Sequence, residues 1–273
     1  MRRMNYAALA SLAGLLAFST GLHAQKNELT ILHVNDTHSH IDPVRGGVDD
    51  GKGGVIERAA FIDEVRRQEG EKNVLLLHGG DFDQGTSYFT VLKGDMEVSV
   101  MNDLAYDATS FGNHEFDNGL DELARRLKNL KVPVVCANYD FENTVIGTYV
   151  KPYVVLERAG MKIGVIGALT DVRTVVDKDI ADKLRYIDPA SCINPIAARL
   201  RNSCDLVIVL SHLGFTEDCE LAEQTRDVDL VIGGHSHTVL KSKAEVRNAD
   251  GKKVTVVQDG CWGLEVGVLK YRK

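Results

Sequence analysis

Hydrophobic residues in this chain gather in short runs, separated by longer stretches in which apolar and charged residues mix. Mainly apolar runs of three to six residues predict buried strands at 29–34, 74–77, 108–111, 132–135, 206–210 and 230–232. Between them, helices are predicted at 53–70, 91–104, 120–130, 194–202 and 217–225. In the first of these helices Ile56, Ala60, Ile62 and Val65 are apolar, and most of the neighbouring residues carry charge.

The last third of the chain has a different pattern. Two predicted strands, at 154–157 and 162–166, form a hairpin around the turn at 158–161. Two more strands are predicted near the end, at 254–258 and 265–269. Early alternation of strands and helices, followed by hairpins, favours α/β layers with mixed sheets over a purely parallel sheet. The 273 residues contain no internal repeat or clear linker, so one domain is expected at 25–273.

Five of the predicted strands end in residue types that bind divalent metals. The candidate ligands, in chain order, are Asp36, His38, Asp81, Asn113, His212, His235 and His237. Each short motif alone is weak evidence, because any strand end can carry an aspartate or a histidine. Five such ends in one chain are improbable by chance, so the sequence predicts a metal centre with two ions.

The residue types suit hydrolysis at such a centre. Asp81 follows Gly79 and Gly80, whose lack of a side chain lets the backbone approach closely, and this makes Asp81 the best candidate for a bridging carboxylate. Neutral imidazoles and an amide limit the total negative charge, so a phosphate dianion is not repelled. His114 and Asp117 are candidate catalytic residues, because a carboxylate on one imidazole nitrogen leaves the other to assist a leaving alkoxide.

Charge excludes some classes of partner. The formal net charge is −7 and the isoelectric point is near 5.7, which does not indicate binding to a nucleic-acid polymer or to an anionic membrane. A phosphate substrate remains compatible with this balance, because bound cations would dominate the local field.

The N-terminus has the pattern of a signal peptide at 1–24. Arg2 and Arg3 precede an apolar stretch at 7–22, and Ala24 offers a small residue before a cleavage point. The alternative is a membrane anchor, but the stretch is short for a bilayer span and contains Ser and Thr. No cysteine follows it directly, so neither a lipid anchor nor another stable membrane anchor is indicated. We expect an exported protein, either periplasmic or secreted.

The five cysteines contain no Cys-x-x-Cys pair, which argues against a zinc ribbon or a redox motif. An exported chain could form one or two disulfides, and spacing does not tell which residues would pair. Cys136, at the end of a predicted strand, is expected to be a small buried hydrophobic residue.

The order of these motifs resembles the calcineurin-like metallophosphoesterase superfamily. The motifs are Asp-x-His at 36–38, Gly-Asp-x-x-x-Gly at 80–85, Gly-Asn-His-Glu-Phe-Asp at 112–117, Ser-His-Leu-Gly at 211–214 and Gly-Gly-His-Ser-His at 233–237. Within that superfamily the segments 35–38 and 112–117 most resemble the exported 5'-nucleotidase, UDP-sugar hydrolase and 2',3'-cyclic phosphodiesterase family. The resemblance extends from residue 29 to the C-terminus.

This resemblance implies an α/β fold, a four-layer α/β/β/α sandwich with two mixed sheets. It implies that one metal is held by Asp36, His38, Asp81 and His237, and the other by Asp81, Asn113, His212 and His235. It further implies that a metal-bridging hydroxide attacks phosphorus in line, with His114 and Asp117 as a catalytic dyad. The two divalent ions could be zinc, manganese, iron or cobalt, which all accept such ligands.

The chain departs from the family in one respect. Family members carry a second, C-terminal domain that grips the nucleotide, whereas this sequence stops at Lys273. We therefore expect a hydrolase of nucleotides or similar small phosphate esters. The alternatives are a catalytic subunit with little selectivity that docks a separately encoded specificity domain, and a phosphodiesterase acting on cyclic nucleotides.

Other polar and aromatic residues receive simpler interpretations. His33 is expected to pack within its strand, and His78 to be structural or to support the site. His40 and Glu115 are left out of the ligand set. Asp42 and Asp83 are expected to be solvated loop acids, and packing is the favoured role for Tyr88 and Trp262, although both could line a cleft.

Overall fold

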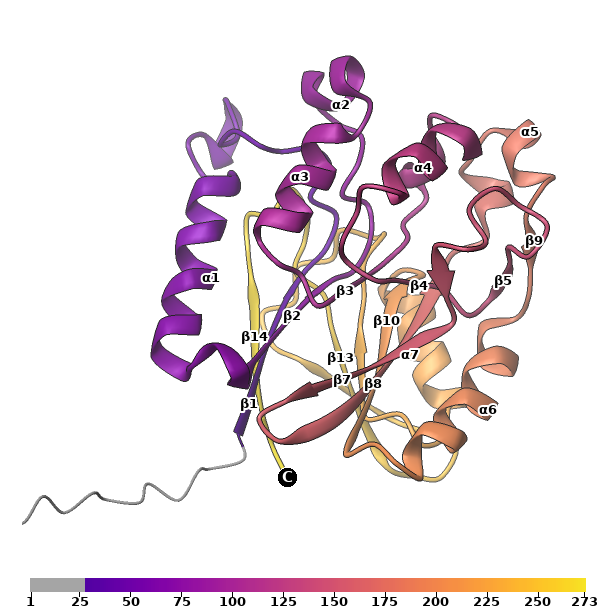
Figure 1. Cartoon of the computed structure of the whole chain (residues 1–273). Coiled ribbons are helices and arrows are strands. Elements are labelled where there is room, and N and C mark those ends of the chain that lie inside the picture. The colour runs from indigo at the N-terminus through magenta and orange to yellow at the C-terminus, as the bar shows by residue number, and fades with distance from the viewer. Residues whose placement is uncertain (1–27) are drawn as a thin grey trace, which may run out of the picture.

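The computed structural model describes residues 28–273, and the expected signal peptide at 1–24 lies outside them. Within this range the chain forms two six-stranded mixed sheets and a small two-stranded sheet, β5–β9 (Figure 1). The small sheet pairs β5 (Tyr139–Asp140) with β9 (Arg185–Tyr186) in antiparallel orientation.

The first large sheet has the strand order β14-β1-β2-β3-β4-β6, and its strands are parallel except for β14, which runs antiparallel to β1. Its strands are β1 (Glu28–Val34), β2 (Val74–His78), β3 (Ala108–Ser110), β4 (Val134–Val135), β6 (Val150–Lys151) and β14 (Gly267–Arg272). The sheet therefore joins the N-terminal part of the described chain to its C-terminal strand.

The second large sheet has the order β12-β13-β11-β10-β8-β7, with antiparallel strands at both edges and a parallel centre. Its strands are β7 (Tyr153–Arg158), β8 (Met161–Leu169), β10 (Leu206–His212), β11 (Leu230–Ile232), β12 (Ala244–Arg247) and β13 (Lys253–Val257). The hairpin predicted around the turn at 158–161 is confirmed as β7–β8.

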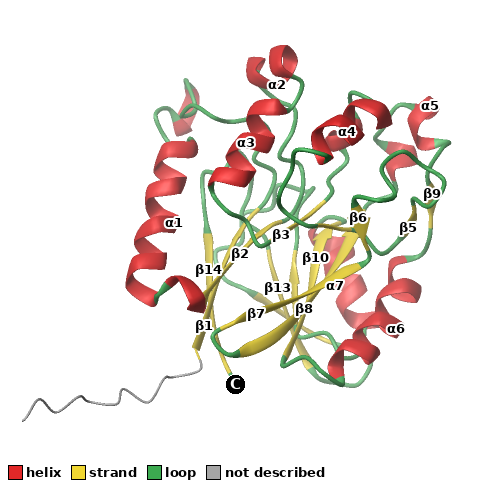
Figure 2. Ribbon diagram, viewed as in Figure 1, coloured by secondary structure: helices red, strands yellow, loops and turns green. Residues whose placement is uncertain are grey.

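Helices cover the outer face of each sheet (Figure 2). On the side of the first sheet lie α1 (Val55–Glu69), α2 (Ser87–Leu92), α3 (Asp95–Asp103) and α4 (Leu120–Leu127). On the side of the second sheet lie α6 (Pro189–Arg201) and α7 (Phe215–Gln224), and the short α5 (Lys178–Ala181) lies near the small sheet. One-turn helices complete the chain, η1 (Gly47–Asp49), η2 (Glu71–Asn73), η3 (His114–Phe116) and η4 (Val172–Thr174).

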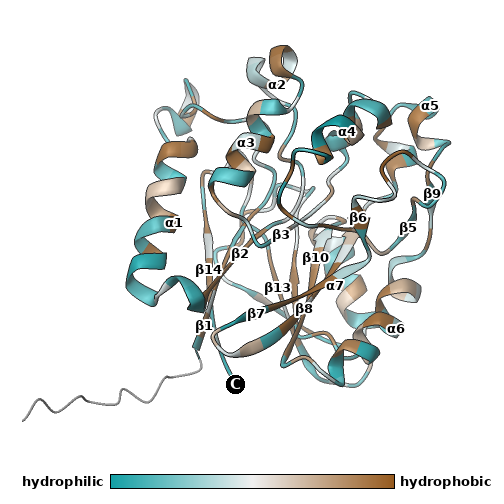
Figure 3. Ribbon diagram, in the orientation of Figure 1, coloured by the Kyte–Doolittle hydropathy of each residue, from teal (hydrophilic) through white to brown (hydrophobic). Residues whose placement is uncertain are grey.

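The central strands alternate between two apolar layers, as Figure 3 shows by their predominantly hydrophobic colour. In β10, Leu206, Ile208 and Leu210 face the first sheet, while Val207 and Val209 pack against α6 and α7. A strand with both faces buried needs apolar residues at consecutive positions, which explains the unbroken runs in the sequence. The α/β/β/α sandwich with two mixed sheets is confirmed.

One predicted helix is wrong in its extent. The segment 91–104 forms parts of two helices, α2 and α3, separated by Lys93 and Gly94, whose φ angles are 52° and 91°. A left-handed backbone ends a helix, and Gly94 accommodates it without strain. A side chain at Gly94 would also meet the buried Arg126 guanidinium, so the position requires glycine.

Two other features of the described part bear on the sequence interpretation. Among residues 28–273, no helix combines the length and apolar content that crossing a bilayer requires. All five cysteines, which lie in this range, are free thiols, and Cys136 is buried as expected. The disulfides considered from composition do not form in this structure.

Candidate metal centre

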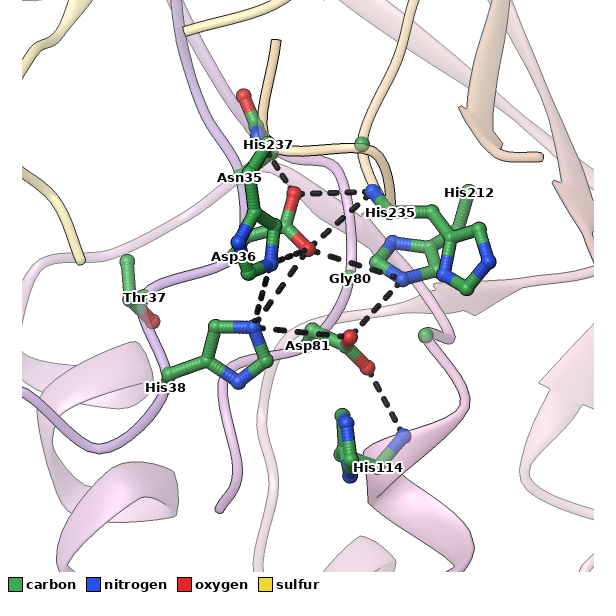
Figure 4. A network of polar contacts seen from close by, with 12 residues as sticks. Asn35, Asp36, Thr37, His38, Gly80, Asp81, His114, His212, His235 and His237 are labelled. Carbon is green, nitrogen blue, oxygen red and sulfur yellow. Dashed lines mark hydrogen bonds and ion pairs between the residues drawn. The ribbon is translucent and has the colours of Figure 1, made fainter. Parts of the chain in front are cut away.

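The carboxyl ends of strands from both sheets bring the predicted ligands together, and Figure 4 labels Asp36, His38, Asp81, His212, His235 and His237 among them. The first sheet contributes the segments that follow β1, β2 and β3, and the second contributes those at the ends of β10 and β11. A cavity of about 540 Å³ is lined there by a set of candidate residues that includes His38, Asp81, Asn113, His114, His235 and His237. The topology, with parallel strands at the centre of each sheet, explains why motifs so far apart in sequence meet.

The backbone at these ligands is unusual. Asp36, His38, Asp81, His235 and His237 all have φ between 45° and 74°, the left-handed region that side chains other than glycine rarely adopt. Each such residue costs about 1 kcal/mol or more unless surrounding contacts hold it. The sharp turns direct successive side chains into the same pocket.

Asp36 is a buried acceptor that joins the two sheets. Its carboxylate accepts hydrogen bonds from the backbone N–H of His235 at 3.1 and 3.0 Å. Its Oδ1 also lies 3.3 Å from Nε2 of His237 and 3.7 Å from Nε2 of His38. These three side chains form one group with mutually close ligand atoms.

Asp81 lies between the two groups of histidines. Its Oδ2 is 3.0 Å from Nε2 of His212 and 3.8 Å from Nε2 of His38, and its Oδ1 accepts from the backbone N–H of His114 at 2.9 Å. The carboxylate is buried and reaches toward both groups, and this is the placement that a bridging ligand requires.

The imidazole of His212 is oriented by the opposite sheet. Its Nδ1–H donates to the carbonyl of Gly79 at 2.6 Å, which leaves Nε2 as the ring atom that faces Asp81. Burial alone would lower the pKa of His212, but the carboxylates of Asp81 and Asp36 raise it to about 10. The two carboxylates therefore attract positive charge strongly into this position.

Two imidazole nitrogens from different sheets also lie close to each other. Nε2 of His38 lies 2.9 Å from Nε2 of His237. Burial lowers the pKa of His38 to about 4, so this imidazole is neutral at neutral pH. A neutral imidazole keeps the lone pair that a metal needs.

The donor set fits divalent cations. The groups with mutually close ligand atoms are Asp36–His38–His237, Asp81–His212–His235 and His38–Asp81–His114. Oδ1 of Asn113 is buried beside them and has no hydrogen-bond partner among the described residues. An unpartnered buried amide oxygen is costly in a protein interior unless a ligand satisfies it, and a cation would do so.

His114 and Asp117 form a hydrogen-bonded pair at the rim of the pocket, with Nδ1 of His114 2.8 Å from Oδ2 of Asp117. Both side chains are about 30% exposed. Burial would lower the pKa of His114, but the bond to Asp117 and the charge of Asp81 raise it overall. The remaining nitrogen, Nε2, is therefore suited to hold a proton close to the predicted ligands.

Glu115 has a role that the sequence interpretation missed. Its buried carboxylate accepts backbone N–H bonds from Asp81, Phe82, Asp83 and Gly112, at 3.0, 2.9, 3.1 and 2.5 Å. Four donors on one carboxylate fix the turn that carries Asp81. The apolar Phe116 beside it was a signal that this segment, although rich in polar residues, is buried.

Asp83 is not a solvated loop acid, and that prediction is wrong. Its side chain is fully buried and forms an ion pair with Arg126, whose Nη2 donates to the carbonyl of Glu115 at 2.8 Å. Burial lowers the pKa of Arg126 to about 10, which leaves it cationic at neutral pH. No local pattern signals this pair, because its members are 43 residues apart and meet only in the folded chain.

The remaining histidines surround the pocket without joining the three groups. His33 is buried and pairs with Asp259. Nε2 of His78 is 3.2 Å from Oγ1 of Thr37, which places it beneath the Asp-x-His turn. Nδ1–H of His40 donates to the carbonyl of His38 at 2.9 Å.

Two aromatic residues lie in clefts, contrary to the favoured packing role. Trp262 lines the metal pocket and stacks on His40, with ring centroids 4.8 Å apart. Tyr88 lines an adjoining cleft, and its hydroxyl donates to Asp42 at 3.2 Å. Asp42 itself is exposed, as predicted.

Residues 29–239 match the family model for the calcineurin-like phosphoesterases. The chain belongs to this family. The predicted superfamily is thereby confirmed, and the ligand-bearing strand ends that define the pocket all lie within the matched residues.

Curated relatives of the chain are 5'-nucleotidases. It is 37% identical over 267 residues to snake venom 5'-nucleotidase of Naja atra, covering 89% of this chain and 50% of that protein. It is 36% identical over 270 residues to the 5'-nucleotidase of Homo sapiens, covering 89% of this chain and 46% of that protein. The chain spans about half the length of the curated relatives it matches.

Solved structures show the same fold. The 5'-nucleotidase precursor of Thermus thermophilus aligns with a TM-score of 0.82 at 36% identity, covering 89% of this chain and 51% of that one. The NAD nucleotidase of Haemophilus influenzae aligns with a TM-score of 0.79 at 30% identity, covering 89% and 47%. Both likenesses support the sandwich architecture described above.

Proposed function

We propose that this chain is a phosphoesterase with two divalent metal ions, acting on nucleotides or on similar small phosphate esters. The observation that carries the proposal is the position of Asp81, a buried carboxylate between Nε2 of His38, which follows a strand of the first sheet, and Nε2 of His212, which ends a strand of the second. That arrangement has the residue types and the shared carboxylate that a two-metal hydrolytic site needs. Membership in the phosphoesterase family supports the same reaction class.

In the proposed assignment Asp36, His38, Asp81 and His237 hold one ion. Asp81, Asn113, His212 and His235 hold the other. When bound, the ions would polarise an attacking water and clamp the phosphoryl oxygens. The protein's own contribution is geometric, because the buried bonds to His212, Asp81 and Asp36 fix the ligand atoms before substrate arrives.

His114 is the proposed catalytic residue outside the ligand set. Asp117 accepts from its Nδ1, which fixes the ring and favours its protonated form. Nε2 can then donate to the ester oxygen as its bond to phosphorus breaks, so that the leaving group departs as an alcohol. Asp117 acts through His114 and is a positioning residue.

Because the curated relatives are 5'-nucleotidases, we propose a nucleoside monophosphate as the substrate. We also propose that residues 1–24 are a signal peptide and that the mature protein begins at Gln25 and is exported. N-terminal sequencing of protein recovered from outside the cytoplasm tests this, and a sequence starting at Met1 would contradict it.

The function is tested by stripping the mature chain of metal and reloading it with manganese, cobalt or zinc. Phosphate release is then measured from AMP, UMP and p-nitrophenyl phosphate, and ring opening of 2',3'-cyclic AMP to a monophosphate is followed by chromatography. We expect metal-dependent release from monoesters and about two metal ions per chain by elemental analysis. The absence of phosphate release with every metal and every ester would refute the proposal.

A further inference from the structure

A cleft of about 860 Å³ lies next to the metal pocket. Two residues, His40 and Trp262, line both spaces, so the cleft adjoins the pocket at the stacked pair that they form. Volumes of this size are ordinary for sites that take a small molecule. The metal ligands do not line the cleft, so the proposed hydrolysis leaves it without a role.

The outer wall of the cleft is an ordered loop. Two backbone hydrogen bonds join the ends of this loop. The N–H of Val55 donates to the carbonyl of Ile41 at 2.8 Å, and the N–H of Val44 donates to the carbonyl of Lys52 at 2.9 Å. Gly46 and Gly47 have φ of 82° and 73°, and the N–H of Gly46 donates to Oδ1 of Asp50 at 2.5 Å. Compact surface loops of this kind are frequently functional.

The opposite wall begins at the N-terminus of α2. Thr86 and Ser87 line the cleft there, next to Tyr88, whose ring adds a second aromatic surface to that of Trp262. In Figure 1 this helix lies at the same end of the molecule as the loop that carries η1. The cleft is therefore bounded by two elements of the first half of the chain and by Trp262 from its C-terminal part.

The chemistry of the lining selects among possible occupants. Asp42 and Asp49 provide two carboxylates, Arg45 is the cation of the lining and Lys52 outside it pairs with Asp49 at 3.0 Å, so the cleft has no excess positive charge that would favour a second phosphate. None of the described residues lining the cleft is an amide that could read the edge of a base. Carboxylates accept hydrogen bonds from hydroxyl groups, and aromatic rings offer flat apolar surfaces to a saturated ring.

We propose that this cleft is a second subsite, which binds the sugar-like, polyhydroxylated part of a phosphate ester whose phosphate occupies the metal pocket. The inference rests on the proposed function for the position of the phosphate. Tyr88 and Trp262 hold the ring, and Asp42 and Asp49 accept its hydroxyl groups.

The first test compares two esters that release primary alcohols of similar basicity, glucose 6-phosphate and ethyl phosphate. We expect the mature chain to favour glucose 6-phosphate at least 10-fold in kcat/KM. Tyr88→Ser should lower this preference about 5-fold or more, and Tyr88→Phe should retain most of it. Val91→Ser is the matched control, because Val91 is 73% exposed on the same helix and does not line the cleft.

Equal turnover of the two esters, or an equal loss of preference in Tyr88→Ser and Val91→Ser, would overturn the subsite while leaving the proposed function intact. A loss in Tyr88→Ser that falls on AMP and spares glucose 6-phosphate would assign the cleft to a base and also overturn it. Hydrolysis of neither ester, nor of p-nitrophenyl phosphate, would refute the proposed function instead.

Binding can be tested without turnover, because Trp262 is the single tryptophan of the chain. In the His114→Ala variant loaded with zinc, a closed-shell ion, indole emission reports on the cleft and on the metal pocket, and inorganic phosphate gives the response of the pocket alone. We expect glucose 6-phosphate to change the emission with a Kd about 10-fold below that of inorganic phosphate. Identical responses to both compounds, or no response to glucose 6-phosphate, would overturn the subsite even if hydrolysis fails.

Discussion

The two sheets supply different halves of the metal centre, and each half is held by a different kind of interaction. The first sheet contributes the carboxylates Asp36 and Asp81, and the buried ionic groups Glu115, Asp83 and Arg126 support the Asp81 turn. The acidic half therefore depends on charged groups that are themselves buried.

The second sheet contributes the imidazoles of His212, His235 and His237, and both the neutral amide of Gln258 and the buried carboxyl group of Asp218 lie against the Gly233 backbone beside them. Gln258 is buried behind them, where its Oε1 accepts from the hydroxyl of Ser236 at 2.9 Å and from the N–H of Thr238 at 2.6 Å. The comparison teaches that the turn carrying the carboxylate of Asp81 is held by buried charged groups, whereas the loop carrying His235 and His237 is held by the amide of Gln258.

The largest expected effect is that of Asp81→Asn. This change removes the one carboxylate placed between both groups of histidines, so we expect kcat/KM to fall by about 10⁴-fold, the scale found when a central catalytic group is removed. Metal content should also fall, measured by elemental analysis after dialysis. The control is Asp63→Asn on the exposed face of α1, and near-normal activity in Asp81→Asn would contradict the bridging role.

His114→Ala separates chemistry from metal binding. Loss of a positioned general acid should lower kcat by about 10²–10⁴-fold. Bound metal should stay nearly unchanged, because neither proposed ion depends on His114. A matching loss of metal would show that His114 is a ligand, an alternative that its proximity to His38 and Asp81 makes worth testing.

Arg126→Met probes the charged scaffold of the acidic half. It leaves Asp83 buried without a partner, so the free energy of unfolding should fall by about 3–5 kcal/mol, measured by urea denaturation. Its neighbour Arg125 is the matched control, because Arg125 pairs with Asp95 and Glu122 at the surface and its replacement should change stability by only about 0.5 kcal/mol. Equal losses of unfolding free energy in the Arg126 and Arg125 variants would show that the buried ion pair does not stabilise the acidic half.

Gln258→Met probes the neutral scaffold of the histidine half. It removes acceptor and donor atoms that hold Ser236, Thr238 and Gly234, and we expect a loss of about 1–3 kcal/mol in unfolding free energy. Metal affinity should weaken less than in Arg126→Met, as measured by calorimetric titration. A larger loss of metal affinity in Gln258→Met than in Arg126→Met would show that metal binding depends more on the second sheet.

Most of the architecture could be predicted from the chain itself. A doubly buried strand such as β10 needs an unbroken apolar run, and polar residues begin at its carboxyl end, so the pattern marks both the strand and the end that carries a candidate ligand. All seven predicted ligands and the His114–Asp117 pair meet in the fold, although their individual roles remain proposals.

What could not be predicted depends on distant partners. Asp83 looks like a loop acid in the sequence, because nothing near it announces Arg126. The break at Lys93 and Gly94 has a local signal in the glycine, whereas the close approach of Arg126 that excludes a side chain there is set by the fold. Trp262 is held beside the Asp-x-His turn by a hydrogen bond from its backbone N–H to the carbonyl of Asp36, at 2.6 Å.

The bond from His212 to the carbonyl of Gly79 has a consequence for the time course of folding. It spans 133 residues, and the bonds from His235 to Asp36 span 199. Contacts so distant in sequence form late, since long loops must close before they exist. Neither sheet can assemble the ligand set by itself, so the capacity to capture metal should appear only when the two sheets have docked, and uptake of cation by a refolding chain marks the completion of its tertiary structure.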